Sequence, residues 1–374
     1  MTTNLYVSSY IGTITSLQLT RHPDASYSLT QVAVNDGSYP NPSWLTRDEH
    51  NGVVYCLDEG LTVLDGSLAS YKTSASGVLT QIDRHSTING PVSSVVYNGG
   101  KALAVAHYTG SAVTSWAILP SGGVQLLQEF PFTLSKPGPD PSRQEAPHPH
   151  QAVVDPTDSF IVVPDLGADL VRIFRIDHST SLLTELVPFK ASLGSGPRHG
   201  AFLASGDATY FFLVSELGNT VTSYRVLYGS DSLSFEELSS SGIYGDRKTP
   251  EGAAAAAALL TPDDKYLLTS SRNATLFQIP SFEPDSSTLI PSDTLQSWKI
   301  DHGTGRLEFH QLAPAGGRFP RQFSVNRDGT LAAVGLQHDG RVVIVQRDVE
   351  NGTFGRFVAE IDVPGNVTCV IWDD

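Results

Sequence analysis

The sequence predicts an all-β protein, a seven-bladed β-propeller that forms one domain over residues 1–374. Three observations predict this fold. A unit of short apolar strands separated by polar turns recurs along the chain. The chain contains 33 Gly and 23 Pro, which is typical of a turn-rich fold. The two ends of the chain carry complementary parts of one further unit, and pairing the last strand with the first would leave no open sheet edge.

Each unit contains a first strand, a turn such as PTD or NRDG, a second apolar strand, a short polar turn and a third strand. The clearest example is HPHQAVVDPTDSFIVVPDLGADLVRIFRID, which starts at His148. Six complete units are visible, and their first strands start near residues 43, 91, 148, 196, 252 and 319. The seventh unit is split, because VTCVIW from residue 367 supplies a first strand and LYVSSY, GTITSLQL and YSLTQVAV near the start of the chain supply its partners.

Three stretches rich in Pro, Ser, Gly and charge are expected to be connections, at residues 133–147, 239–252 and 281–296. The first two lead directly into first strands, so we expect them on the rim of one face. The run AAAAAALL from residue 253 is ambiguous, because alanine is the best helix former. Its position in the repeat favours a strand, since the innermost strands of a propeller crowd around a narrow axis where small side chains fit.

Composition excludes some partners. The formal net charge of −15 disfavours nucleic acid and anionic membrane surfaces, which need clustered Lys and Arg. No stretch approaches the roughly 20 apolar residues of a membrane span, and the sequence MTTNLYVSSY lacks the features of a secretion signal. A soluble, cytoplasmic protein is therefore expected. Cys56 and Cys369 lie far apart inside apolar runs, which predicts buried thiols rather than a disulfide.

The repeat also predicts where polar side chains gather. In an antiparallel hairpin the start of the first strand and the end of the second lie at the same edge. In a propeller these positions line one mouth of the central channel. The starts of first strands supply His148, His150, Arg198, His199 and Arg321, and the ends of second strands supply Tyr108, Asp165, Glu216, Arg272 and Gln337. Converging Arg, His and carboxylate groups indicate a pocket for an anionic or carbonyl-bearing small molecule.

These runs also resemble a known family. PHPHQAVVDPTDSFIVVPDLGADLVRIFRID and GPRHGAF…VSELGNTVTSY resemble successive blades of the 6-phosphogluconolactonase-type lactonases, which are seven-bladed propellers, and PRQFSVNRDGTLAAVGLQHDGRVVI resembles a late blade. The same family includes carboxy-cis,cis-muconate cyclase, an enzyme without a cofactor. The resemblance implies an active-site set of His150, Arg198, Glu216 and Arg272. The chain has Ser93 and Ser94 where many relatives carry a Cys-His pair, which leaves the substrate open.

The residue types suggest roles for this set. His150 titrates near neutrality and suits general acid or base work on a lactone, although a structural histidine is the alternative. Arg198 and Arg272 are suited to hold a carboxylate or phosphate or to stabilise an oxyanion, and salt bridges between blades are their alternative. Glu216 is equally compatible with orienting water, acting as a base and pairing with an arginine.

The remaining candidates receive secondary roles. His148 is expected to shape its loop, and Asp165 and Asp169 to fix a tight turn. Arg321 and Gln337 are secondary ligand candidates. No zincin, EF-hand, phosphate-loop or GxSxG motif occurs, so neither a metal nor a cofactor is expected.

Three functions remain open from the sequence. The first is a cofactor-independent lactone hydrolase, in which the two arginines hold the substrate and His150, helped by Glu216, transfers the proton. The second is a cycloisomerase or lyase that uses the same residues to close a lactone. The third is a non-catalytic propeller that binds a protein or peptide on its rim. The oligomeric state does not follow from the sequence.

Overall fold

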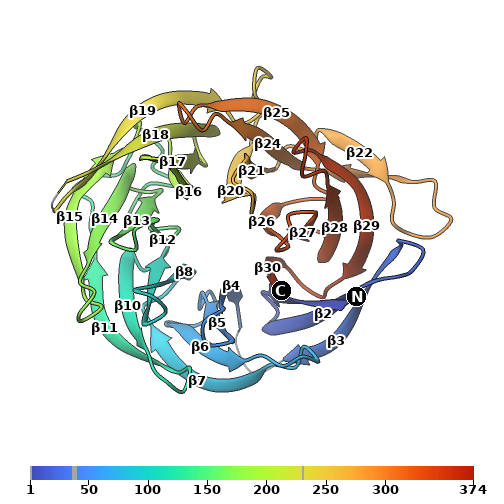
Figure 1. Cartoon of the computed structure of the whole chain (residues 1–374), viewed down its shortest axis with the longest axis horizontal. Helices are drawn as coiled ribbons and strands as arrows, with labels where there is room; N and C mark the ends of the chain where they lie inside the picture. Colours follow the sequence, from blue (N-terminus) through green and yellow to red (C-terminus); the bar gives the residue numbers. More distant parts are fainter. Residues whose placement is uncertain (1, 36–39, 230) are drawn as a thin grey trace.

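The computed structural model describes residues 2–35, 40–229 and 231–374, and within these residues it contains thirty strands and no helix. Seven four-stranded sheets are arranged radially around a central axis, with one additional two-stranded sheet (Figure 1). The predicted all-β, seven-bladed propeller is thereby confirmed. No helix that could cross a membrane is found in the described ranges.

Each blade contains four strands, ordered from the axis outward. Blade 1 contains β30 (Val367–Asp373), β1 (Thr2–Ser9), β2 (Thr13–Arg21) and β3 (Tyr27–Asn35). Blade 2 contains β4 (Pro42–Asp48), β5 (Val53–Asp58), β6 (Gly66–Lys72) and β7 (Thr80–Thr87). Blade 3 contains β8 (Pro91–Tyr97), β9 (Ala102–His107), β10 (Ala112–Ile118) and β11 (Val124–Pro131). Blade 4 contains β12 (Val153–Val154), β13 (Phe160–Asp165), β14 (Leu170–Ile176) and β15 (Leu183–Lys190).

The other three blades follow the same order. Blade 5 contains β16 (Pro197–Ser205), β17 (Ala208–Ser215), β18 (Thr220–Tyr228) and β19 (Leu233–Gly242). Blade 6 contains β20 (Ala254–Leu260), β21 (Tyr266–Arg272), β24 (Thr294–Ile300) and β25 (Leu307–Pro314). Blade 7 contains β26 (Pro320–Val325), β27 (Leu331–Leu336), β28 (Arg341–Arg347) and β29 (Phe354–Asp362). The two-stranded sheet contains β22 (Phe277–Pro280) and β23 (Leu289–Ser292).

The closure of the ring joins the two ends of the chain. β1 pairs antiparallel with β30, from Asn4 opposite Asp373 to Ser9 opposite Val367. This pairing confirms the prediction that the C-terminal strand completes a blade with the N-terminal strands. Within the described residues this pairing gives blade 1 its fourth strand, so that β1 does not present an open edge.

The alanine run forms a strand. β20 covers Ala254–Leu260 and pairs with β21, so the strand alternative was correct and the helical propensity of alanine was overridden. Figure 1 shows β20 as the innermost strand of its blade.

The third expected connection was wrong in part. Residues 281–296 were predicted to be irregular, yet β23 and the start of β24 lie within them. The third strand of blade 6 is β24, whereas the apolar residues after Ala274 form β22 in the inserted hairpin. The physical reason is burial, because Trp298 of β24 is fully buried between sheets while Leu276 beside β22 is exposed. Residues 239–242 also belong to β19 rather than to a connection.

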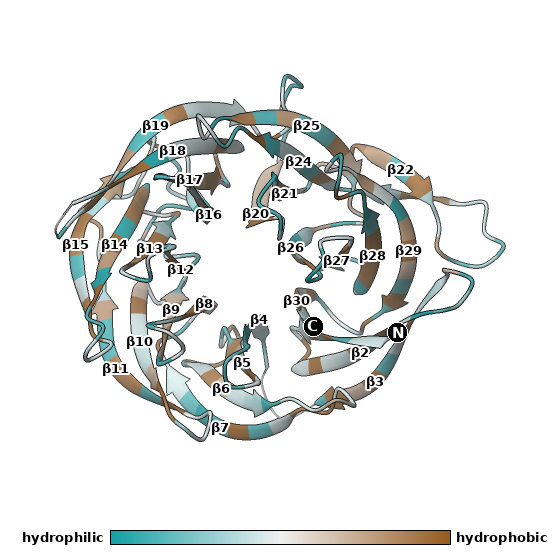
Figure 2. Ribbon diagram, viewed as in Figure 1, coloured by the Kyte–Doolittle hydropathy of each residue, from teal (hydrophilic) through white to brown (hydrophobic). Residues whose placement is uncertain are grey.

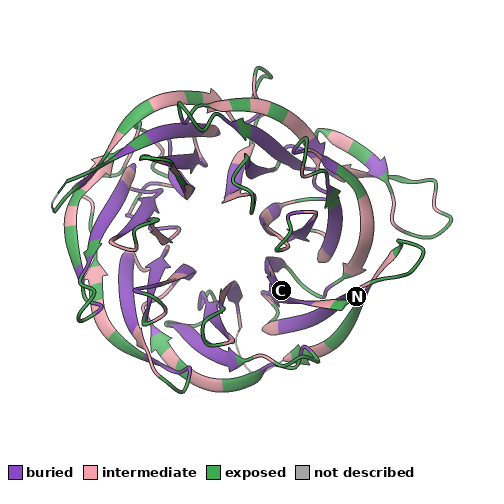
Figure 3. Cartoon of the chain, in the orientation of Figure 1, coloured by how far each residue is buried: buried purple, intermediate pink, exposed green. Residues whose placement is uncertain are grey.

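The hydrophobic core lies between neighbouring blades. Phe160 and Val162 of β13, for example, pack in one cluster with Phe211 and Leu213 of β17. The inner and middle strands are mostly buried, while the outermost strands alternate between exposed and partly buried positions (Figure 3). Their apolar residues alternate with hydrophilic ones in the same way (Figure 2). Cys56 and Cys369 are both buried free thiols, as the sequence predicted.

The two faces of the ring differ in what the chain does there. At one face the first strands begin and the second strands end, and we call it the arginine face for the residues described below. At the opposite face the tight turns join first strands to second strands, and we call it the hairpin face. The connection at residues 133–147 precedes the first strand of blade 4 and therefore lies at the arginine face.

Candidate active site

Arg198 and Arg321 share one local structure. Each follows a proline that opens a first strand, and in both strands the pairing register skips the arginine. Proline is tolerated at the first position of a strand, where its missing N–H matters least. A bulge inserts one unpaired residue and redirects its side chain. The Pro-Arg sequence thus places a guanidinium at the arginine face of blades 5 and 7.

Glu216 and Arg272 come from the ends of second strands. Glu216 directly follows β17, and Arg272 is the last residue of β21. Arg143 reaches them from the connection between β11 and β12. The three arginines Arg143, Arg198 and Arg272 and the carboxylate of Glu216 form the arginine cluster, which joins segments far apart in the sequence.

Glu216 is the centre of the arginine cluster. Its Oε1 lies 2.6 Å from Nη2 of Arg143. Its Oε2 lies 2.9 Å from Nε of Arg198 and 2.6 Å from Nη2 of Arg272. Burial raises the pKa of Glu216, but the charges of Arg272, Arg198 and Arg143 outweigh burial and lower the pKa to about 2. Glu216 is therefore ionised throughout the physiological pH range.

The arginine cluster holds excess positive charge. Three guanidinium groups share one carboxylate, which leaves two positive charges without a partner inside the cluster. Burial and the neighbouring Arg272 lower the pKa of Arg198. An arginine in contact with an ionised carboxylate nevertheless keeps its proton. Concentrated positive charge at a buried position of a chain with a net charge of −15 favours an anionic ligand.

The alanine strand shapes this site. Arg198 donates from Nη1 to the carbonyl oxygen of Ala256 at 2.7 Å. Arg272 donates from Nη2 to the carbonyl oxygen of Ala255 at 3.3 Å. Methyl side chains leave room for two guanidinium groups to approach the β20 backbone, so the alanine run explains how both arginines are fixed beside Glu216.

Two buried histidines face the same charges. The ring centroids of His150 and His199 lie 5.2 Å apart. Nδ1 of His150 and Nε2 of His199 are buried and lack a hydrogen-bond partner among the described residues. Burial lowers the pKa of His150 well below its usual value, and the charges of Arg198, Arg321 and Arg272 lower it further. The pKa of His199 is lowered in the same direction, first by burial and then by Arg198. Both imidazoles are therefore neutral at pH 7.

A second ion pair lies at the same face. Arg321 contacts Oε1 of Glu59 through Nη2 at 2.8 Å. The Tyr10 hydroxyl donates to Glu59 and accepts from Arg321. These contacts balance the charge of Arg321 locally, whereas the arginine cluster retains its excess.

Potential metal ligands do not gather in the described part of the chain, where no group of three or more His, Cys, Asp or Glu side chains is placed to hold an ion. We assign no residue to a metal or a cofactor.

Comparisons with known proteins identify the family of this chain. The model of the family "Lactonase, 7-bladed beta-propeller" matches residues 4–372. This chain belongs to that lactonase family. A protein of Arthroderma benhamiae named "Probable 6-phosphogluconolactonase" is 28% identical over 368 residues, which cover 97% of this chain and 88% of the relative. The 6-phosphogluconolactonase of Bacillus subtilis is 24% identical over 328 residues, covering 87% of this chain and 85% of the relative.

Solved structures show the same fold. The periplasmic gluconolactonase of Pseudomonas aeruginosa superimposes with a TM-score of 0.82 at 23% identity, covering 100% of this chain and 99% of that chain. At this identity the likeness concerns the fold.

The structure brings the four residues of the predicted active-site set to one face. Arg198, Glu216 and Arg272 contact one another, and His150 lies within the field of the two arginines. Of the alternatives open for Glu216, the geometry favours pairing with arginine, since three guanidiniums occupy its two oxygens. Gln337 is buried at the same face, and its Oε1 lacks a partner among the described residues.

Two other candidates, Asp165 and His148, are held by framework contacts. Asp165 is fully buried, accepts from the His148 backbone N–H at 2.7 Å and from Nε of Arg172 at 2.8 Å, and is not available to a substrate. His148 directs Nδ1 to the Tyr108 carbonyl oxygen and Nε2 to Glu145. Its ring stacks on Tyr108 with centroids 4.2 Å apart. These contacts favour the turn and loop roles that the residue types suggested for Asp165 and His148 over direct contact with a substrate.

Sequence reasoning missed three residues of this face. Tyr10 and Glu59 directly follow the second strands of blades 1 and 2, so the rule applied to the other blades would have found them. Arg143 had no such signal, because it lies within a connection that has no repeat position. Its basic side chain between Ser and Gln is indistinguishable in sequence from any exposed loop residue.

Proposed function

We propose that this chain is a lactone hydrolase that acts on small, sugar-derived lactones carrying an anionic group. The observation that carries the proposal is the arginine cluster, with its excess positive charge beside the buried, neutral His150. The names of the relatives, 6-phosphogluconolactonase and gluconolactonase, support the reaction class. The substrate is a small molecule, and the cytoplasmic location predicted from the sequence stays a prediction.

The reaction needs a water molecule and no other co-reactant. Water attacks the lactone carbonyl carbon, the carbonyl oxygen becomes an oxyanion, and the bond between the carbonyl carbon and the ring oxygen then breaks. His150 accepts a proton from the attacking water and returns it to the ring oxygen, so that the product is the open hydroxy acid. Arg198 and Arg272 stabilise the oxyanion, because fixed donors in a buried site act strongly on developing charge.

Glu216 is a positioning residue in this proposal. With a pKa of about 2 it does not exchange protons near neutrality. Its Oε2 instead holds both Arg198 and Arg272 in fixed orientations, which preserves the directions of the donors. The role of base falls to His150, since its neutral form has an unpartnered nitrogen.

An anionic substrate would make His150 a stronger base. The positive charges of Arg198, Arg321 and Arg272 lower the pKa of His150 in the free protein. A carboxylate or phosphate bound beside these arginines offsets their charge and raises the pKa of the imidazole. Binding and proton transfer are thereby coupled, which favours charged lactones over neutral ones.

The test is an assay of the unaltered chain and two variants, His150→Ala and Arg272→Ala, on aldonolactones, phosphorylated lactones and muconate-type acids. The proposal expects hydrolysis of an anionic lactone and its loss in both variants. Formation of a lactone from the acids, without hydrolysis, would replace it with the cycloisomerase alternative. Absence of turnover on all three classes would favour the non-catalytic scaffold.

A further inference from the structure

Arg143 differs from the other members of the arginine cluster in its origin. Arg198 and Arg272 belong to strands of the propeller, whereas Arg143 belongs to the connection at residues 133–147. The side chain of Arg143 is 38% exposed, whereas that of Glu216 is 3% exposed. Arg143 therefore lies on the solvent side of the arginine cluster, where an arriving ligand meets it first.

The backbone beside Arg143 is held firmly. Gln144 is fully buried and donates from Nε2 to the Leu166 carbonyl oxygen at 2.9 Å. The backbone N–H groups of Arg143 and Gln144 both donate to the carbonyl oxygen of Asp140, at 3.0 and 2.7 Å. Gly138 packs so closely that an added Cβ would lie 2.8 Å from the Cβ of Gln144. The connection thus presents Arg143 from a backbone that these hydrogen bonds and contacts hold in place.

The contacts of Arg143 can be exchanged at low cost. Apart from Glu216, its recorded side-chain contact is a long one of 3.4 Å to the Tyr108 hydroxyl. Glu216 keeps Arg198 and Arg272 on its other oxygen if Arg143 leaves. Arg198 and Arg272, in contrast, are also tied to backbone carbonyls of β20. Arg143 is the member of the arginine cluster that a ligand can recruit without leaving a buried charge unpaired.

We infer that Arg143 is a specificity-determining residue. Its guanidinium moves away from Glu216 and binds the peripheral anionic group of the substrate, and this contact selects charged lactones over neutral ones. The inference rests on the proposed function and adds to it the residue that distinguishes charged lactones from neutral ones. A guanidinium binds a carboxylate or a phosphate through a planar pair of N–H donors, and the backbone held in place at Arg143 restricts where that pair can reach.

The experiment compares two lactones that differ in one anionic group, gluconolactone and 6-phosphogluconolactone, with spontaneous hydrolysis subtracted. We expect Arg143→Gln to lower kcat/KM for the phosphorylated lactone by about 10- to 100-fold, as expected for loss of a charged hydrogen bond. We expect kcat/KM for the neutral lactone to change by less than about threefold. The matched control is Lys136→Gln, which removes an exposed positive charge from the same connection and should change neither value.

A second measurement separates the inference from the proposed function. Calorimetry gives the affinity of each protein for the open products, 6-phosphogluconate and gluconate, independently of turnover. Turnover of neither lactone by the unaltered chain contradicts the proposed function. A preference for 6-phosphogluconate that disappears in Arg143→Gln still supports the inference. Equal losses on both lactones, or an unchanged ratio of the two kcat/KM values, overturn the inference and leave the proposed function intact. Thermal unfolding of Arg143→Gln checks that it is folded.

Discussion

At the hairpin face the carboxylates of Asp155 and Asp158 accept hydrogen bonds from backbone amides, whereas at the arginine face Glu216 is held by three arginine side chains. Asp155 accepts from the N–H groups of Ser159 and Phe160 at 2.9 and 2.7 Å. Asp158 accepts from the N–H of Asn98 in the neighbouring blade at 2.9 Å. These aspartates stabilise turns and join blades. They retain little capacity to bind a ligand.

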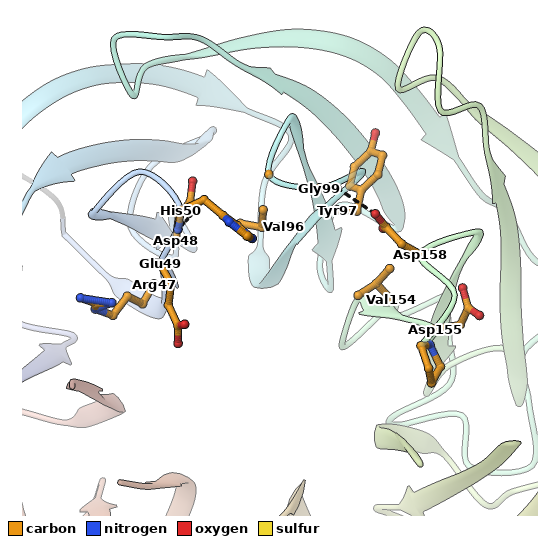
Figure 4. A pocket seen from close by; sticks show the side chains of 12 residues that line it. Arg47, Asp48, Glu49, His50, Val96, Tyr97, Gly99, Val154, Asp155 and Asp158 are labelled. Carbon is orange, nitrogen blue, oxygen red and sulfur yellow. Dashed lines mark hydrogen bonds between the residues drawn. The ribbon is translucent and has the colours of Figure 1, made fainter. Parts of the chain in front are cut away.

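The hairpin face nevertheless carries a cavity. It has a volume of about 420 Å³ and is lined by turns of blades 2, 3 and 4. Figure 4 shows the side chains of Asp155 and Asp158 on one side of the cavity and those of Glu49 and His50 on the other. Asp48, which also lines it, accepts from the His50 backbone N–H at 3.0 Å. A cavity with charged walls is thus present at the face where turn geometry already accounts for the buried carboxylates.

The polar groups of the two faces differ in whether the protein itself satisfies them. At the arginine face, buried nitrogens of His150 and His199 lack partners among the described residues, and positive charge exceeds negative charge. Such groups are costly to bury unless a ligand or water satisfies them. Buried polar atoms without a hydrogen-bond partner, together with uncompensated charge, therefore indicate a site better than a cavity does.

The largest expected effect contrasts two histidines at opposite faces. His150→Gln removes the proposed base and should lower kcat/KM on the anionic lactone by about 10²- to 10⁴-fold. His50→Gln changes an exposed side chain of the hairpin face and should leave kcat/KM within about twofold. Initial rates at pH 7 measure both. Similar rates for the two variants would remove the chemical distinction between the faces.

The next effect concerns stability. Glu216→Gln leaves three arginines without their carboxylate and should lower the free energy of unfolding by about 3–5 kcal/mol. Asp155→Asn weakens hydrogen bonds within a turn and should lower it by about 1–3 kcal/mol. Urea denaturation measures both variants, and added phosphate should recover part of the loss in Glu216→Gln alone. A larger loss in Asp155→Asn would show that the arginine cluster is not a concentration of excess charge.

The fold could be predicted because its signals are local and repeated. The alternation of apolar strands and turns identifies blades, and a strand such as β20 is recognised by its place in the repeat. The hairpin of β22 and β23 shows the limit of this reasoning. The residues of β22 have the apolar pattern of a strand, but the pattern does not state which sheet the strand joins. β21 pairs with β24 rather than with β22, and the burial of Trp298, a tertiary effect, decides this pairing.

The candidate site could be predicted where a side chain has a fixed place in the repeat. Arg198 and Glu216 occupy such places, and Tyr10 and Glu59 follow the same rule. Arg143 lies in a connection whose path depends on the buried Gln144, and no periodicity predicts that path. The ionisation and pairing of Glu216 could not be predicted either, because they depend on three arginines from separate segments.

A smaller effect concerns acid stability. The folded pKa of His199 lies well below the usual value, so the unfolded chain binds a proton more readily between pH 6.5 and the folded pKa. Stability should therefore fall as pH falls below 6.5. His199→Gln should make this dependence shallower between pH 6.5 and 5.5, with the remainder due to His150, whereas His50→Gln should retain the full slope. Glu216 does not contribute in that window, because its stabilisation is lost only as pH falls from 4.5 towards about 2. Urea denaturation at several pH values provides the slopes.

The smallest effect contrasts two glutamates at opposite ends of β5. Glu59→Gln removes the negative partner of Arg321 and raises the positive charge of the arginine face. The KM for the anionic lactone should therefore fall by about two- to fivefold, since added positive charge attracts the substrate. Glu49→Gln at the hairpin cavity should leave KM unchanged, because substrate does not bind there. Steady-state kinetics at low ionic strength measure both, and salt should reduce the difference. A rise of KM in Glu59→Gln would mean that Glu59 holds Arg321 in place for the substrate, and charge alone would no longer distinguish the two faces.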